Sequence, residues 1–432
     1  MSRVTRYALR IVFCTFAGIL VFVLFGKKKY TSSASLSAHA WKKFRNNPLG
    51  YTSLLFILSV AFIALLGYLV TPDPTPFAND QCLELGTRKP GFSATFLMVR
   101  KNQPGDHMNL VEKMLRGKRS EYTAIPIQHY RFEGTDILVE EFTDTITELP
   151  PERSFNIADV IYPLGSDTTR VIWKKNNLIF RDIEGKAYIE PVDDMQREII
   201  LKNIIKRTYI LGTDRFGRDL LSQMIIGARV SLSVGLISVA ISLVIGILLG
   251  SLAGYFKGRT DSVILWFINV VWSVPTLLLV IAINFALGKG FWQVFVAVGL
   301  TMWVEVARVV RGQFLSLREA EFVESARALG YSDLRIIVHH ILPNIFGVII
   351  VIAAANFASA ILLEAGLSFL GIGVQPPMPS WGSMIKENYG YIILDSAYLA
   401  ILPGVAILLM VLAFMMMGNA LRDALDVKTS AL

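Results

Sequence analysis

Long runs of apolar residues, separated by short polar connections, dominate the second half of the chain. Each run has roughly the 20 residues that an α-helix needs to cross a hydrocarbon core of about 30 Å. The runs are continuous and do not alternate with polar residues, which favours helices over the strands of a membrane barrel. The pattern therefore predicts an all-α polytopic membrane protein. The predicted spans are 51–70, 231–255, 263–287, 292–310, 345–370 and 399–417.

The N-terminal region has a further apolar run at 9–25, with arginines before it and three lysines after it. A cleaved signal peptide is the alternative, because "SAHA" resembles a cleavage site. That tetrapeptide lies far from the apolar run, so residues 1–35 are predicted to form an extra transmembrane anchor. Residues 36–50 then place Trp41 and Phe44 among basic residues, which is typical of a helix at the cytosolic membrane interface.

Residues 71–210 mix both charge signs and have no long apolar run. Segments such as "AIPIQHYRFEG", "TDILVEEFTD" and "NLIFRD" suggest strands, and the apolar positions of 192–207 repeat with a helical period. The segment is long enough to bury a core of its own. We therefore expect an inserted α+β domain between the first span, 51–70, and the remaining five spans, which lie within 211–428.

Composition and charge support a membrane protein and indicate its orientation. The 432 residues are 53% hydrophobic and only 18% charged, and the mean hydropathy is +0.51. The net charge of +8 arises from Lys and Arg that flank the apolar runs, as the positive-inside rule expects, so nucleic-acid binding is not predicted. The basic connections 256–261 and 308–318 are predicted to be cytosolic, as is the C-terminus. The segment 371–382 lacks Lys and Arg and suits the far side, and alternation then places 71–210 outside.

The sequence offers little catalytic chemistry. The two cysteines, Cys14 and Cys82, form no His/Cys pattern with metal-ligand spacing. His339 and His340 are adjacent and point about 100° apart on a helix, so they do not form a chelating pair. No nucleophile constellation is present. Neither a metal site nor an enzymatic activity is predicted for this chain.

A charged stretch, "EFVESARALGYSDLRIIVHHILPN", separates two of the predicted spans. Phe322, Ala326 and Leu329 recur at i, i+4 and i+7, which predicts an apolar stripe on an otherwise charged helix. Gly330 is placed where a residue in the left-handed conformation would end that helix.

The second part of this stretch predicts another short helix. Ser332 is expected to cap it, and Pro343 is expected to stop it just before the next span. Two short helices would then meet at a glycine corner. Such an object is either an idle connector on the membrane surface or a knob that docks into a groove of a soluble partner.

The segments "ESARALG" and "HILPN" resemble the EAA loop of the permeases of bacterial ATP-binding cassette (ABC) importers. Ser325 and His340 depart from the general pattern of that loop, and "HILPN" is typical of the dipeptide, oligopeptide and nickel branch. "LGTDRFGRDLLSQMIIGARVSLSVG" and "EAGLSFLGIGVQPPMPSWGSMI" are similar to further signatures of that branch. The resemblance covers roughly 40–70 and 210–428, and includes neither the first apolar run nor most of the insertion.

The resemblance implies the type I importer permease fold for 211–428, with a cytosolic EAA loop at 312–344. The chain would form half of a pathway for peptides or similar small solutes in the bacterial inner membrane. Its partners would be a homologous permease, two cytosolic ATPase subunits and an extracytoplasmic solute-binding protein. ATP and Mg would belong to the ATPases, since this chain has no P-loop. The implied coupling residues are Glu324, Ser325, Ala326, Gly330, Leu342 and Pro343.

Other residues are weaker candidates. Glu364, near the outer end of its span, is a candidate for a pathway or gate residue, as are Pro275, expected to kink its helix, and Asn269, expected to bond between helices. Glu305 is expected to pair with Arg308 on the helix surface. A structural role is expected for the signature residues Gly212, Thr213, Asp214, Gly217, Arg218 and Asp219. Their short polar side chains can cap a helix start, and the arginine can pair with a neighbouring carboxylate.

Two questions stay open from the sequence alone. Gly246, Gly250 and Gly254 favour close helix packing, either within the chain or at a seam between two permeases. The main alternative function is a membrane sensor or carrier whose outer domain binds ligand without ATP coupling. A stable complex with an ATPase would distinguish the importer from both.

Overall fold

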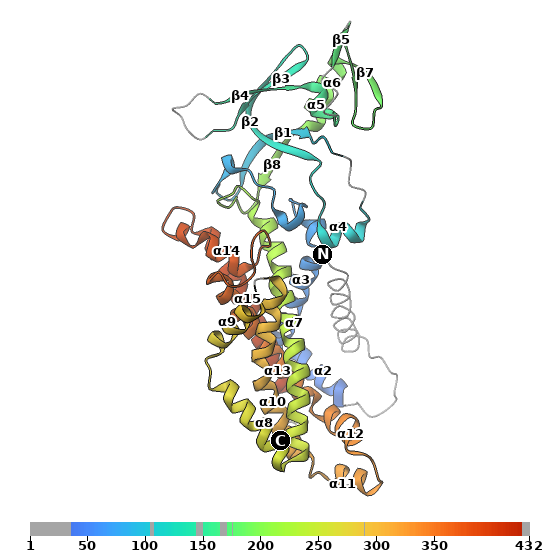
Figure 1. Ribbon diagram of the computed structural model, residues 1–432, viewed down its shortest axis with the longest axis vertical. Coiled ribbons are helices and arrows are strands. Elements are labelled where there is room, and N and C mark those ends of the chain that lie inside the picture. The colour runs from blue at the N-terminus through green and yellow to red at the C-terminus, as the bar shows by residue number, and fades with distance from the viewer. Residues whose placement is uncertain are drawn as a thin grey trace. The chain divides into compact units, whose positions relative to one another are not determined.

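The computed structural model describes residues 36–103, 108–143, 150–164, 171–174, 176–288 and 290–425. The predicted anchor at 1–35 lies wholly outside these residues. The chain divides into two compact units, whose elements are labelled in Figure 1. The first unit comprises 1–58, 232–364 and 408–432, and the second comprises 59–231 and 365–407.

Long apolar helices confirm the predicted spans. Among the described residues, five helices are long and apolar enough to cross a membrane, or six if one bent pair forms a single span. The helix α7 begins well before the predicted start of its span at 231. The prediction started late because polar Gln223 and Arg229 interrupt the apolar pattern before that position. The span helices outside the bent pair are α3 (Pro48–Val70), α7 (Leu220–Phe256), α10 (Phe291–Leu317), α13 (Leu342–Phe369) and α15 (Tyr398–Leu425).

The bent pair lies in the first unit and replaces the continuous helix predicted at 263–287. The helices α8 (Gly258–Trp272) and α9 (Thr276–Leu287) meet at 93°. Pro275 lies at this break, where it has no N–H to donate and disfavours helical geometry in the residue before it. The kink expected at Pro275 is therefore a full break in the helix.

Glycines of α7 pack directly on α10 within the first unit. A Cβ atom on Gly250 would lie 2.6 Å from the carbonyl oxygen of Ala307 and 2.9 Å from the Cβ of Val310. Gly246 and Gly254 likewise have α10 residues as their nearest neighbours. The small-residue run therefore serves packing inside the chain.

The second unit contains two antiparallel sheets, in agreement with the strands predicted from the sequence. The larger sheet has the order β4-β3-β2-β1-β8 and the smaller one β5-β6-β7. The strands are β1 (Phe92–Arg100), β2 (Tyr122–Glu133), β3 (Asp136–Glu141), β4 (Glu152–Asn156), β5 (Ile172–Lys174), β6 (Asn177–Arg181), β7 (Ala187–Pro191) and β8 (Ile204–Tyr209).

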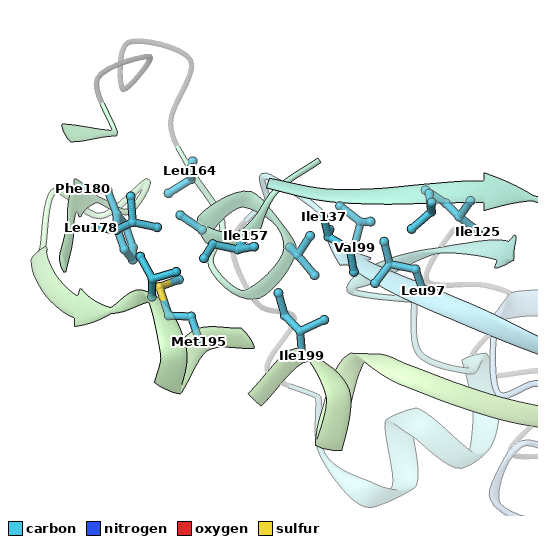
Figure 2. Packing of buried hydrophobic residues seen from close by; sticks show 14 of the residues in the cluster. Leu97, Val99, Ile125, Ile137, Ile157, Leu164, Leu178, Phe180, Met195 and Ile199 are labelled. Carbon is cyan, nitrogen blue, oxygen red and sulfur yellow. The ribbon is translucent and has the colours of Figure 1, made fainter. Parts of the chain in front are cut away.

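Helices connect the two sheets across a shared hydrophobic core. They are α5 (Ile157–Ile161) and α6 (Val192–Glu198), the latter followed by a π-helical turn at Ile199–Asn203. Figure 2 shows side chains of the smaller sheet and α6 at one end of this core and side chains of the larger sheet at the other. Ile157 and Ile199 lie between these two groups.

The helix predicted over 192–207 ends earlier than expected. Residues from Ile204 onward form β8, which pairs with β1 at the edge of the larger sheet. Met195 and Ile199 are buried as predicted, whereas Ile200 is exposed. Pairing with the edge of β1 overrides the local helical periodicity here.

Candidate functional site

The predicted coupling loop forms a sharp corner in the first unit. The helix α11 (Glu321–Ala328) ends at Gly330, whose φ of +79° lies in the left-handed region. The N–H of Gly330 donates to the carbonyl of Arg327 at 2.9 Å, and that of Tyr331 donates to the carbonyl of Ala326 at 3.1 Å. This pair of bonds is a Schellman motif, which satisfies the last carbonyls of the helix. The role predicted for Gly330 in ending the helix is confirmed.

The second short helix differs from the prediction. The turn α12 (Asp333–Arg335) continues through a π-helical segment, Ile336–Ile341, directly into α13. Pro343 therefore does not stop a helix. The π-helical turn before it changes the hydrogen-bond register, so the missing N–H of the proline is tolerated. Ser332 stands at the helix start, but its side chain makes no capping hydrogen bond.

A buried cluster ties this corner to the spans. Val323 and Ala326 of α11 belong to one cluster with side chains of α7, α10, the π-helical segment and α13, and the half-buried Leu342 joins them. The hydroxyl of Tyr255 at the end of α7 also donates to Asp333 Oδ1 at 2.6 Å. The corner is thus fixed to its supporting helices and is not a loose connection. The other buried members of the cluster are Tyr255, Val306, Val310, Phe314, Ile336, Ile337, Ile341, Ile345 and Ile349.

The exposed surface of the corner differs from the predicted stripe. Phe322 is 39% exposed and Leu329 is 73% exposed, so only Ala326 of the three stripe residues is buried. Val323 takes the inward position, because the supporting helices contact α11 on its Val323–Ala326 side. The remaining predicted coupling residues, Glu324, Ser325, Gly330 and Pro343, are all exposed.

The signature 212–219 forms a buried polar turn in the second unit. Arg218 Nε donates to Asp214 Oδ2 at 2.6 Å, and Nη2 donates to Glu387 Oε2 at 2.7 Å. Asp219 Oδ2 accepts the backbone N–H of Ser222 at 2.8 Å and thereby caps the start of α7. Thr213 is also fully buried and donates to the carbonyl of Leu85 at 2.5 Å. These are the capping and ion-pair contacts predicted for this turn.

Glycines of the same turn allow close backbone approach. Gly212 and Gly217 have φ of +82° and +70°. A side chain on Gly217 would overlap the carbonyl group of Cys82. The turn therefore requires glycine at both positions for conformation and space.

Burial controls the acid–base chemistry of this region. Burial raises the pKa of Asp214, and the Arg218 guanidinium acts against that rise. Burial also raises the pKa of Asp219, opposed by the hydrogen bonds from Ser222. The Cys82 thiol has its pKa raised to about 12, chiefly by burial and then by its contact with Glu84.

A cavity of ≈ 300 Å³ opens in the first unit around the break between α8 and α9. Val274 and Thr276, which flank Pro275, line it, together with Glu305 of α10 and Ser359 of α13. Neither Asn269 nor Glu364 is among its lining residues. Glu364 is fully buried and Asn269 is exposed, so the structure does not bring the three predicted pathway residues to one site.

The ion-pair partner predicted for Glu305 from the sequence pattern is wrong. The predicted pair with Arg308 does not form, since no ion pair joins these two described residues. The Arg308 guanidinium instead lies 3.6 Å from the ring centre of Trp272. A cation–π contact with a Trp on another helix is not visible in i, i+3 spacing. The only available sequence signal was an ionisable residue within an apolar run.

Among the described residues, no group of three or more His, Cys, Asp or Glu side chains is arranged to hold a metal ion.

The long apolar helices define the chain as a polytopic membrane protein. Residues 246–430 match the family described as binding-protein-dependent transport system inner membrane component. Residues 35–85 match the N-terminal TM domain of oligopeptide transport permease C.

Curated relatives are similar over half of this chain. The glutathione transport system permease protein GsiD of Pectobacterium atrosepticum is 42% identical over 50% of this chain and 72% of its own length. The oligopeptide transport system permease protein OppC of Haemophilus influenzae is 40% identical over 51% and 70%. The di/tripeptide transport system permease protein DppC of Pseudomonas aeruginosa is 43% identical over 51% and 72%.

The chain belongs to this family of ABC importer permeases. It is a permease subunit of an ABC importer, and the family's activity is transport and not catalysis. ATP and Mg belong to the ATPase subunits of such importers. Among solved structures, the inward-facing MetNI methionine ABC transporter is similar with a TM-score of 0.41 and 17% identity, over 48% of this chain and 97% of that one.

Proposed function

We propose that the corner formed by α11 and α12 docks on a cytosolic ATPase subunit and transmits its movement to the membrane helices. The observation that carries this proposal is the buried base of the corner. A docking surface transmits force only if it is fixed to the elements that must move. Val323 and Ala326 pack against residues of α7, α10 and α13 in one cluster, so a displacement of α11 is passed to three spans at once.

The surface of the corner suits such a partner. Phe322, Leu329 and the 71%-exposed Leu334 are large apolar side chains in a charged setting. A helix that presents apolar anchors enters a groove of a soluble protein in a common mode of recognition. Glu324 lies exposed beside these anchors, where it can contact the partner directly.

The proposed topology places the corner, α2 and the C-terminus in the cytosol and 71–210 outside as an extracytoplasmic α+β domain. Two contacts within the first unit support this arrangement. Phe44 of α2 packs with Ala420 and Ala424 at the end of α15. A Cβ added to Gly347 of α13 would lie 3.1 Å from Leu425 Cδ1. In the second unit, Lys89 pairs with Asp395 in the connection between α13 and α15 at 2.6 Å.

The proposed cargo is a peptide or a similar small solute. The relatives support this, because their names assign glutathione, dipeptides and oligopeptides to them. A second permease and a solute-binding protein would complete the assembly with two ATPases. The cavity at the α8–α9 break, with Glu305 in its wall, is the proposed position for part of the transport pathway.

Substitutions at the corner test the coupling. We expect Glu324→Ala to reduce uptake of labelled peptide strongly while ATPase subunits and permease still assemble in the membrane. Glu321→Ala is the matched control, since Glu321 is also an exposed glutamate of α11. Uptake should be highest with Gly330 unchanged and should then fall in the order Gly330→Asn, Gly330→Ala, Gly330→Val. The reason is that Asn tolerates the left-handed conformation better than other non-glycine residues. No atom lies within 4 Å of a Cβ added there, so this order tests conformation and not crowding.

Normal uptake by both Glu324→Ala and Gly330→Val would refute the coupling role. An equal loss of uptake in Glu321→Ala and Glu324→Ala would show that α11 tolerates no substitution of an exposed glutamate. That result would also count against a specific contact by Glu324.

A further inference from the structure

The short helix α4 (Leu110–Arg116) of the second unit buries none of its own side chains. Val111 and Leu115 stand i, i+4 on one side of the helix with Leu110 next to them, and Leu110, Val111 and Leu115 are 76%, 64% and 42% exposed. A helix of seven residues is too short to be stable in water by itself, and most helices gain their stability by burying an apolar face. The apolar face of α4 therefore needs an apolar surface that the described part of the chain does not supply.

The backbone of α4 is fixed beside the ends of two spans. The N–H of Lys118 donates to the carbonyl of Pro74, just beyond α3, at 2.9 Å. Arg229 Nη1 of α7 donates to the carbonyl of Met114 at 3.0 Å. Gly117 between them has a φ of +72°, and a Cβ there would lie 2.8 Å from the Pro74 oxygen. Figure 1 shows α4 beside this end of α3.

This level of α3 has the features of a membrane–water interface. The Tyr68 hydroxyl accepts the N–H of Phe77 at 2.9 Å, and the Arg229 guanidinium lies 5.7 Å from the Tyr68 ring centre. Tyr side chains are enriched where spans leave the bilayer. The last two residues of α3, Leu69 and Val70, are exposed and apolar, as expected of a lipid-facing surface. The contacts of α4 with Pro74 and Arg229 hold it close to this end of α3.

The polar side of α4 is basic. Residues 110–119 contain four basic side chains and a single acidic one, Glu112, which pairs with Arg116 at 3.2 Å. Lys118 pairs with Glu121 at 2.5 Å. Basic residues on the polar face of an amphipathic helix attract anionic lipid headgroups.

We propose that α4 lies in the bilayer interface and anchors the inserted domain to the membrane surface. In this arrangement Leu110, Val111 and Leu115 enter the acyl-chain boundary, and Lys113 and Arg119 contact anionic phospholipid headgroups. The occupant of this face is the lipid that already surrounds α3, so no additional partner is required. The proposal rests on the membrane spans of the family and is independent of how the chain couples to ATPases.

Depth-dependent fluorescence quenching tests the position of α4. The full chain carrying Cys14→Ser and Cys82→Ser is placed in phosphatidylcholine nanodiscs and labelled with NBD at Leu110→Cys. We expect blue-shifted emission and strong quenching by a lipid with a nitroxide at a shallow acyl position. Ile189→Cys on β7 is the matched control, since Ile189 is similarly exposed at 65%. Equal emission and quenching at the two positions would overturn the proposal.

The lipid preference is tested with the headgroup. Adding phosphatidylglycerol should increase the quenching at position 110, and Lys113→Gln with Arg119→Gln should abolish that increase. A label at position 110 that becomes shielded only when a solute-binding protein is added would reject lipid in favour of a protein partner. Because transport is not measured, a failure of the coupling proposal would leave these results unchanged.

Discussion

Arg218 shows how a single buried side chain can hold distant segments together. Its guanidinium pairs with Asp214 in its own turn and with Glu387 of α14 (Trp381–Asn388), and it reaches Asn79 at 3.3 Å. The Arg218 side chain is only 7% exposed. Removing one partner of a buried ion pair leaves an uncompensated charge, which costs about 3–5 kcal/mol. Arg218 is therefore expected to be essential for the stability of the second unit.

Arg218→Met should lower the thermal stability of the purified protein in detergent by an amount of that order. Arg218→Lys should not retain the thermal stability of the unsubstituted protein, since an ammonium lacks the planar fork that reaches several acceptors. The loss of thermal stability in Arg218→Met should shrink as the pH falls. Without Arg218 the pKa of Asp214 rises further, so the folded state binds a proton more tightly than the unfolded state and gains stability on acidification. A pH-independent loss would contradict this account.

Cys82 should react slowly with iodoacetamide at neutral pH. Its pKa of about 12 gives a thiolate fraction on the order of a thousandfold lower than that of an ordinary thiol. Two proteins are compared, both with Cys14→Ser: one keeps Cys82, and the other carries Cys82→Ser and Leu83→Cys. Mass spectrometry should show alkylation about tenfold or more slower at Cys82 than at position 83. Leu83 is the matched position because it is adjacent and 68% exposed. Comparable rates would show that the thiol is not protected.

At the scale of elements, the contact between α7 and α10 depends on small side chains. Gly250→Ala should destabilise the protein by roughly 1–3 kcal/mol, because the added methyl group overlaps the α10 backbone at Ala307. Gly312→Ala is the control on α10, where a Cβ meets nothing within 4 Å. It should be neutral or slightly stabilising, since Ala favours a helix over Gly. Thermal unfolding of both variants in the same detergent checks the difference.

Elements with long, strongly periodic patterns were predictable, and elements decided by neighbours were not. Six apolar runs gave the spans, and Gly330 gave the corner, because both signals are local. The end of the helix over 192–207 was missed because the edge of β1 captures residues from Ile204. The continuous helix through Pro343 was missed because the π-helical turn before it has no sequence signature.

At the scale of the whole molecule, the site was only partly predictable. The predicted coupling residues rest on a resemblance of motifs, and the structure adds the buried cluster that fixes α11. The cavity residues were not predicted as a group, because Glu305, Thr276 and Ser359 come from three helices far apart in sequence. Pro275 pointed to that place through the helix break it causes, and Glu305 did so only as an ionisable residue within an apolar run.

The inserted domain should fold as an isolated fragment. It has a contiguous core, and its first and last strands pair directly, with Phe92 opposite Tyr209. We expect residues 89–211 to give a soluble protein with a cooperative thermal transition. Leu97→Asp, at a fully buried core position, should abolish that transition. A fragment that shows no transition before the substitution would mean that the membrane helices are needed for its fold.

The adjacency of β1 and β8 has a consequence for how such a permease can change. Gly91 and Tyr209 are joined by a hydrogen bond of 2.9 Å from the Gly91 N–H to the Tyr209 carbonyl. The whole domain thus departs from and returns to nearly one point of the chain. A gene could acquire, lose or exchange this cassette with a short peptide bridging the gap, leaving the sequence of the membrane helices unchanged.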